Sequence, residues 1–269
     1  MKGWIAAGAV AAAGTLAVRK GLRTMPKSFD AFRSDVPPMR YAPIPAGLPE
    51  PVARHLEVVV GDSLPITDSA VISGRMTMRL AGPALPGRFR FSHQVGRGYR
   101  HYLEVTPFGR RIMTGQEWYL DGHARLDLPT GVVENQPKID RAANLSMWAE
   151  YAWLPSALVD PRVTWEPIDA VSARMVVPEA SGPDALVVFS DPHSGLIDRF
   201  EAMRWRAPDD AEPTRWVVRN HAWTRIDGVG VPAIASLQWA DQSQPWLKLS
   251  LDSVIWNADL EQYVTASGV

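Results

Sequence analysis

The 269-residue sequence contains no cysteine, which excludes disulfide bonds, thiolate metal sites, a cysteine nucleophile and a lipidated cysteine anchor. It also lacks an excess of one charge, because it contains 28 Lys and Arg residues and 29 Asp and Glu residues. A chain without a basic surplus has no general attraction for nucleic acid, so we predict no nucleic-acid partner. The hydrophobic fraction of 46% and the charged fraction of 21% are typical of a folded protein.

The motifs of several large enzyme classes are missing as well. The sequence has no G-x-S-x-G nucleophile elbow, no P-loop and no H-E-x-x-H zinc motif. Gly96-Arg97-Gly98 begins like a dinucleotide-binding turn, but His101 stands where the third glycine belongs. No two histidines show metal-ligand spacing on one predicted element. We therefore predict no cofactor and no metal ion, and no motif identifies a catalytic residue.

A hydrophobic run of ordinary transmembrane length is also absent. Trp4–Val18 is uncharged but, as a helix, it spans roughly 22 Å, less than the roughly 30 Å hydrocarbon core of a bilayer. Basic residues flank it on both sides, at Lys2 and at Arg19, Lys20 and Arg23. Three interpretations remain open: a retained membrane anchor, a cleaved signal peptide, and an Ala-rich helix lying on the body. The charged flanks favour the anchor, and the side of the membrane stays undecided.

We expect three parts in the chain. Residues 1–25 form an N-terminal apolar helix, and residues 26–49, which contain six prolines, form an extended tether. Residues 50–269 form a single β-rich domain that opens with a short helix at Glu50–Val60. Alternation of apolar and polar residues, as in Val71–Leu80 and Arg88–Val95, is typical of strands with one buried face.

Short turns separate about a dozen such strands, which predicts an antiparallel order. Asp121-Gly122 and Asp227-Gly228 are strong two-residue hairpin signals. The exception is Asp140–Leu158, where apolar residues recur at helical spacing. We expect Asp140 to be its N-cap and Pro155 to end the helix near Leu154. The predicted fold is a mainly β, curved antiparallel meander, with this helical insert over one face of the sheet.

Four stretches of the body read LPEPVARHL, AEYAWLPSALVDPRVTWEPIDAVSAR, IDGVGVPAIASLQW and WLKLSLDSVIWN. Together they resemble the DUF6544 family of uncharacterised bacterial proteins, over Leu48 to Asn257. The most specific part is Glu150–Leu158, with Trp165 and the Ser172-Ala173 pair. The resemblance implies no particular activity. It implies a distant likeness to LolA-like lipoprotein carriers, in which a half-barrel wraps an apolar cavity closed by helices.

Three functions are compatible with these observations. The first is a membrane-associated protein that binds a lipid or another hydrophobic small molecule beneath the insert. Its predicted ligand-binding residues are bulky or adaptable apolar side chains: Met76, Met78, Trp148, Tyr151 and Trp153. The second is an enzyme for a hydrophobic substrate, with His101 or His93 as base and Glu104 or Glu117 as its partner. The third is an envelope scaffold whose interior is packed and holds no cavity.

Strand Thr214–Ile226 carries arginines on one face, including Arg215 and Arg219. Such a face suits an anionic head group. It equally suits a solvated outer surface on which the arginines pair with Asp198 or Glu201 of a neighbouring strand.

Overall fold

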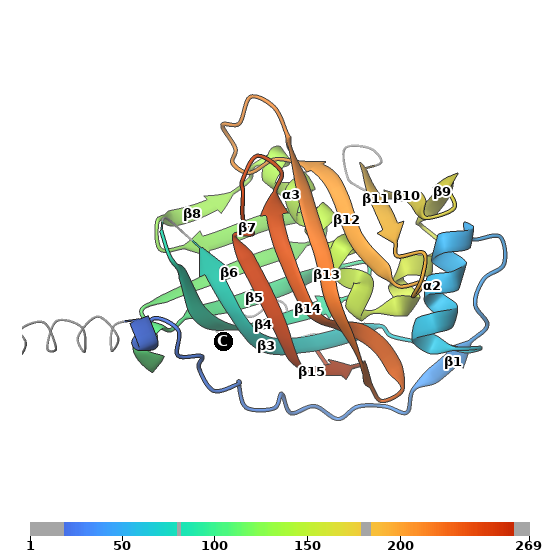
Figure 1. The fold of residues 1–269 in the computed structure, drawn as a ribbon, viewed down its shortest axis with the longest axis horizontal. Coiled ribbons are helices and arrows are strands. Elements are labelled where there is room, and N and C mark those ends of the chain that lie inside the picture. The colour runs from blue at the N-terminus through green and yellow to red at the C-terminus, as the bar shows by residue number, and fades with distance from the viewer. Residues whose placement is uncertain (1–18, 80–81, 179–183, 261–269) are drawn as a thin grey trace, which may run out of the picture.

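The structure, a computed structural model, describes residues 19–79, 82–178 and 184–260. Thirteen strands form one antiparallel sheet in the order β8-β7-β6-β5-β4-β3-β15-β14-β13-β12-β11-β10-β9 (Figure 1). The strands are β3 (Ser69–Arg79), β4 (Ala84–Gln94), β5 (Gly98–Val105), β6 (Met113–Leu120), β7 (His123–Leu128), β8 (Gly131–Glu134), β9 (Thr164–Asp169), β10 (Ser172–Val177), β11 (Asp184–Ser190), β12 (Ile197–Arg204), β13 (Thr214–Ile226), β14 (Val229–Trp239) and β15 (Leu247–Trp256). The predicted mainly β, antiparallel meander is confirmed. The exception to chain order is β15, which returns to lie between β14 and β3.

The two Asp-Gly hairpins are confirmed, with both turn residues at positive φ. Asp121 and Gly122 have φ of 50° and 89°, and Asp227 and Gly228 have φ of 47° and 84°. Positive φ at both central positions is the geometry of a type I′ turn, whose twist matches that of the flanking strands. The turns fix the pairing of β6 with β7 and of β13 with β14, and with it which side chains face the concave side.

Three strands were not predicted. β1 (Arg40–Ala42) pairs with β2 (Leu64–Ile66) as a separate two-stranded sheet, and β8 forms one edge of the large sheet. Each has only three or four residues. A run this short contains too few alternations to be recognised by periodicity.

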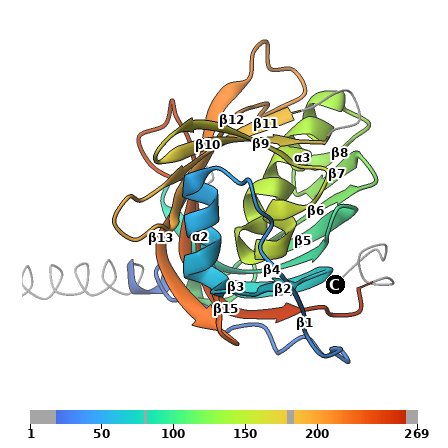
Figure 2. The ribbon, with the colours of Figure 1, turned by 90° about the vertical axis from the view of Figure 1, so that its right-hand side faces the viewer.

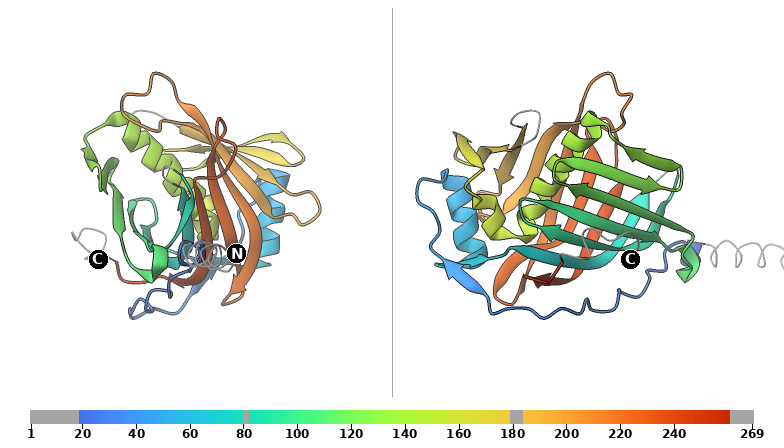
Figure 3. Two further views of the ribbon diagram at one scale, coloured as in Figure 1. Left: turned by 60° about the vertical axis from the view of Figure 1, so that its left-hand side comes forward. Right: turned by 180° about the vertical axis from the view of Figure 1, so that it is seen from behind.

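The helical insert consists of α3 (Pro137–Glu150) and two 3₁₀ turns, Tyr151–Trp153 and Pro155–Val159. The sheet curves around it, so that α3 lies inside the half-barrel (Figures 2 and 3). The predicted N-cap, Asp140, is wrong. The N-cap is Gln136, and α3 begins at Pro137, three residues before Asp140. Pro suits that position because the first helical N–H groups have no intrahelical partner. Asp140 instead accepts a hydrogen bond from the backbone N–H of Ala124 on β7, at 2.7 Å.

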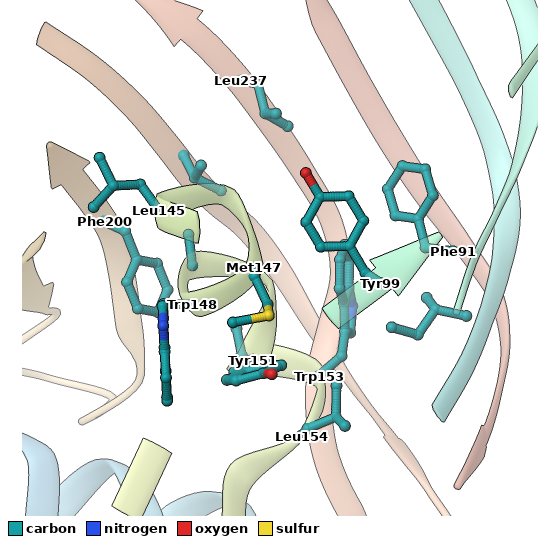
Figure 4. Packing of buried hydrophobic residues seen from close by; sticks show 14 of the residues in the cluster. Phe91, Tyr99, Leu145, Met147, Trp148, Tyr151, Trp153, Leu154, Phe200 and Leu237 are labelled. Carbon is teal, nitrogen blue, oxygen red and sulfur yellow. The ribbon is translucent and has the colours of Figure 1, made fainter. Parts of the chain in front are cut away.

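Helix α2 (Glu50–Val60) was predicted with the observed bounds. It lies beside the insert and packs against β10, β11 and β14 (Figure 2). Val52 and Leu56 form a small apolar cluster there with Leu64 and Ala173. The larger core lies between the concave face of the sheet and the insert, and Figure 4 shows how its aromatic residues surround α3.

Residues 26–39, within the predicted tether, have no helix or strand and run along the outer face of the sheet (Figure 1). Phe29 is in contact with this face, since the guanidinium group of Arg88 lies 4.1 Å from its ring centroid. Trp4–Val18 falls outside the described residues. Among the residues that the structure does describe, none of the helices has the length and apolarity that crossing a membrane requires.

Candidate functional site: a buried histidine cluster

Two histidines of the sheet meet a carboxylate of the insert inside the protein. Glu150 is the last residue of α3, and its Oε2 lies 2.8 Å from His101 Nε2 and 2.9 Å from His93 Nε2. His93 is fully buried, His101 is 4% exposed and Glu150 is 9% exposed. We call His93, His101 and Glu150 the histidine cluster.

Strand register places both histidines on the concave face. β4 and β5 pair with His93 opposite Tyr99 and Phe91 opposite His101. Side chains directly opposite each other point to the same face, and so do residues two apart on one strand. His101 therefore stacks between Phe91 and Tyr99, with ring centroids 3.9 and 4.0 Å away. Figure 4 shows these two aromatic rings beside the insert. The stacking fixes the plane of the His101 ring.

The surroundings of the cluster decide its charge. Burial on its own would raise the pKa of Glu150, but the charge and hydrogen bond of His101, together with the nearby His93, lower it to about 2. Burial lowers the pKa of His93, and the Glu150 carboxylate opposes that shift. The result is an ionised carboxylate oxygen held between two imidazoles, an arrangement that can bind a proton or a metal cation.

His93 is poorly satisfied in this arrangement. Its Nε2 is in ion-pair contact with Glu150 Oε2 at 2.9 Å, although the direction of that contact is poor for a hydrogen bond, and its Nδ1 has no hydrogen-bond partner among the described residues. A buried polar group without a partner costs about 1–3 kcal/mol. Such a group in a folded protein calls for an explanation, and a bound water or ion is one of the usual ones.

The predicted carboxylate partners of the histidines are wrong. Glu104 points to the outer face, where it pairs with Arg88 at 2.6 Å and accepts a hydrogen bond from Tyr102 at 2.8 Å. Glu117 lies on the concave face but accepts its hydrogen bond from Tyr99. Prediction missed Glu150 because the sequence does not show how the insert docks on the sheet. The available signal was a single acidic residue within the mostly apolar stretch Leu145–Leu154.

The five predicted ligand-binding residues all lie in the large core. Met76 is on the concave face of the sheet, while Trp148, Tyr151 and Trp153 project from the insert. Tyr151 accepts a hydrogen bond from the backbone N–H of Gly96 at 3.0 Å. The structure brings these residues together, and their role in binding a ligand stays a prediction.

Two of the spaces that border the insert lie along the second half of α3, on adjoining faces. Asn144, Met147 and Trp148 line an open cleft of about 250 Å³. Ala149, Ala152 and Trp153 line an enclosed gap of about 10 Å³, which we call the apolar gap. Its sheet side is formed by Trp216, Val218, Asn220, Pro232, Ala235, Leu237 and Leu249, and Glu150 borders it.

A volume of 10 Å³ holds about one water molecule. The preformed cavity that the carrier hypothesis requires is therefore not found on the side of the insert that faces β13 and β14, and the larger cleft on the adjoining side, bordered by Tyr119 of β6, is open to solvent. The close packing of the insert against the sheet is what the scaffold hypothesis expects. The enzyme hypothesis requires a substrate pocket at the histidines, and the gap is too small to be one.

The arginines of β13 lie on a solvated outer surface, which is the second of the two alternatives given for Thr214–Ile226. Arg219 pairs with Asp198 at 2.6 Å, and Arg215 lies 3.6 Å from Glu201. Both partners belong to the neighbouring β12, as the second alternative predicts.

A third buried histidine was not considered in the sequence. His55, on α2, is fully buried, and its Nδ1 accepts a hydrogen bond from the backbone N–H of Ile197 at 3.1 Å. Its ring lies edge-on to Trp223, 5.1 Å between centroids. Burial lowers the pKa of His55 to about 3. The signal was its position on the apolar face of α2, three residues after Val52 and next to Leu56.

Solved structures with a similar fold share little sequence with this chain. A LolA superfamily protein from Nitrosomonas europaea is 10% identical, with 81% of this chain and 96% of that chain covered and a TM-score of 0.47. A DUF1329 family protein from Desulfovibrio piger is 11% identical, with 79% and 92% covered and a TM-score of 0.43.

Among curated proteins, the sequence finds no match. A family model does match it, over residues 39–249, and its description is "Family of unknown function (DUF6544)". This region contains the sheet from β3 to β14, the insert and all three residues of the histidine cluster. The match covers more than three quarters of the chain, which therefore belongs to the DUF6544 family.

Proposed function

We propose that this protein binds a hydrophobic ligand, such as a lipid, in the hollow of the sheet that the insert fills. The observation that carries the proposal is the contrast between the large apolar concave face and the small segment that covers most of it. The larger part of the hollow is filled by one continuous segment, Pro137–Val159, and α2 covers β10 and β11 at one end of the sheet. A segment whose covalent links to the sheet are at its two ends can move away as a unit once the hydrogen bonds that hold it to the sheet break.

The gap side of the insert suits this movement. Small residues, Ala149 and Ala152, face the sheet there and interlock little with it. Trp153 provides polar anchors: its Nε1 donates to Pro232 O at 2.9 Å, and its carbonyl accepts from Trp256 Nε1 at 3.0 Å. A ligand that enters would take the place of the insert's apolar contacts. Each Å² of apolar surface that the ligand buries would contribute ~25 cal/mol to the free energy of binding.

The test is the binding of a polyene fatty acid that fluoresces when buried, titrated into the full-length protein. We expect saturable binding of one ligand per chain. The variant Ala235→Leu fills the sheet side of the gap and should weaken binding by roughly tenfold or more, because its three added carbon atoms occupy the site. The matched control is Ala185→Leu, the same change in an outer groove beside Val187 and Met203, which should leave the affinity unchanged.

Absence of saturable binding by the unmodified protein refutes the proposal and supports the packed scaffold. Equal weakening by the two leucine variants also refutes it, because the ligand would then bind elsewhere. Unfolding curves of both variants establish that they are folded under the conditions of the titration.

We propose in addition that the N-terminal run Trp4–Val18 attaches the chain to a membrane, where such a ligand is found. Its uncharged composition and basic flanks support this. Membrane flotation tests it: the full chain should float with lipid vesicles, and a chain that begins at Met39 should stay at the bottom of the gradient. Equal flotation of the two chains would contradict the attachment.

A further inference from the structure

We propose that His93, His101 and Glu150 bind a divalent transition-metal ion, with zinc as the best fit. Each residue offers one ligand atom, and the three atoms lie within 4.8 Å of one another. Two histidines and one glutamate form a known ligand set of zinc, in which water takes the fourth position. Imidazole nitrogen is a ligand that zinc, copper, iron and nickel all accept.

The cluster must rearrange to hold an ion. Around zinc, with bonds of about 2.0–2.1 Å in tetrahedral geometry, neighbouring donor atoms stand about 3.3 Å apart. Here the two Nε2 atoms lie 2.8 and 2.9 Å from Glu150 Oε2, so each would move away from it by a few tenths of an ångström. The three donor atoms spread over as much as 4.8 Å, so the two histidine donors would also have to approach each other. The two histidine rings are inclined at 65°, with centroids 5.7 Å apart.

A second observation points to an ion independently of this spacing. His93 is fully buried at the cluster, and neither of its ring nitrogens forms a hydrogen bond within the described residues. An imidazole that serves only to bind Glu150 would turn its N–H toward the oxygen, as His101 does. A metal ion between the three side chains would give His93 Nε2 a well-directed bond in place of its poorly directed contact with Glu150.

The surroundings meet two further requirements of a metal site. His101 is held by its stacking between Phe91 and Tyr99, so the ligand is oriented before the ion binds. The apolar gap, which Glu150 borders, has room for about one water molecule, the usual fourth ligand.

An ion at this position would join the sheet to the insert. His93 and His101 belong to β4 and β5, whereas Glu150 ends α3. Metal binding would therefore fasten the insert inside the half-barrel. The binding itself does not depend on the proposed lipid function, and the experiment below contains no hydrophobic ligand.

The test uses Co²⁺ as a coloured probe and Zn²⁺ as its competitor. Because the cluster is buried, the full-length protein is refolded from urea with one equivalent of Co²⁺ and then dialysed. We expect a visible absorption band with one Co²⁺ per chain, which Zn²⁺ removes. Glu150→Gln and His93→Gln should each weaken Zn²⁺ binding by about 100-fold or more, because one of three protein ligands is lost.

The matched control is His123→Gln. His123 is also a histidine near a carboxylate, 3.9 Å from Asp140, but its side chain is 81% exposed. This variant should bind Co²⁺ like the unmodified protein. A missing absorption band in the unmodified protein overturns the proposal, and so does equal binding by the folded cluster variants.

If the cluster variants do not fold, crystals of the unmodified protein with Zn²⁺ decide the question. Anomalous scattering at the zinc edge locates the ion. An ion between His93, His101 and Glu150 supports the proposal, and an ion only at surface residues overturns it.

Discussion

Two buried histidine sites in this protein show opposite solutions to the same problem. His55 lies under α2 with apolar neighbours and one backbone donor, and its pKa falls to about 3 because nothing compensates for burial. In the histidine cluster, two imidazoles share the carboxylate of Glu150, whose pKa falls to about 2. Burial alone makes a histidine an uncharged structural residue, whereas burial beside a carboxylate makes it part of a potential ion-binding site.

The largest expected effect comes from removing the carboxylate from the cluster. Glu150→Ala should lower the free energy of unfolding by about 3–5 kcal/mol, because it leaves both imidazoles without their buried anionic partner. Urea denaturation at neutral pH, with a chelator present so that metal makes no contribution, measures the change.

The control for this variant is an exposed carboxylate. Glu166 pairs with Arg174 at 3.1 Å, and about half of each side chain is exposed. Glu166→Ala should cost no more than about 1 kcal/mol, as is usual for surface ion pairs. If Glu150→Ala costs as little as Glu166→Ala, the cluster is no more important to stability than a surface pair, and the contrast with His55 disappears.

The course of the strands could be predicted from the sequence because it depends on local signals. Alternation located the long strands, and the Asp-Gly turns located two hairpins, since only a few residue types tolerate positive φ at both positions. The helix Glu50–Val60 followed from Pro51, which suits the first turn of a helix. The short strands β1, β2 and β8 were missed because they have too few residues to show a period.

The sequence predicted only part of the histidine cluster. Alternation placed His93 and His101 on the apolar faces of their strands, which the register confirms. Their partner Glu150 is 49 residues from His101 in sequence, and its position depends on how α3 docks inside the curved sheet. The same docking decides how much space remains beneath the insert. Composition shows that tryptophans are plentiful, but not whether they line a cavity or fill it.

The smaller expected effect is a difference in acid stability that comes from His55. The unfolded chain binds a proton at His55 near pH 6.5, whereas the folded protein does not until about pH 3. Between these values the unfolded state binds more protons, so the stability contributed by neutral His55 is complete above pH 6.5 and decreases as the pH falls. The decrease is about 1.4 kcal/mol per pH unit for a single group in this window.

The variant His55→Asn tests this contribution, because an amide oxygen can still accept the hydrogen bond from Ile197 N–H but does not titrate. It should be less stable than the unmodified protein at pH 7, because the smaller side chain leaves unfilled space. Its stability should nevertheless decrease less steeply between pH 6 and pH 4, measured by urea denaturation at each pH. Identical slopes for the two proteins would mean that His55 is protonated in the folded state, and that it has a partner for its charge just as the histidine cluster has Glu150.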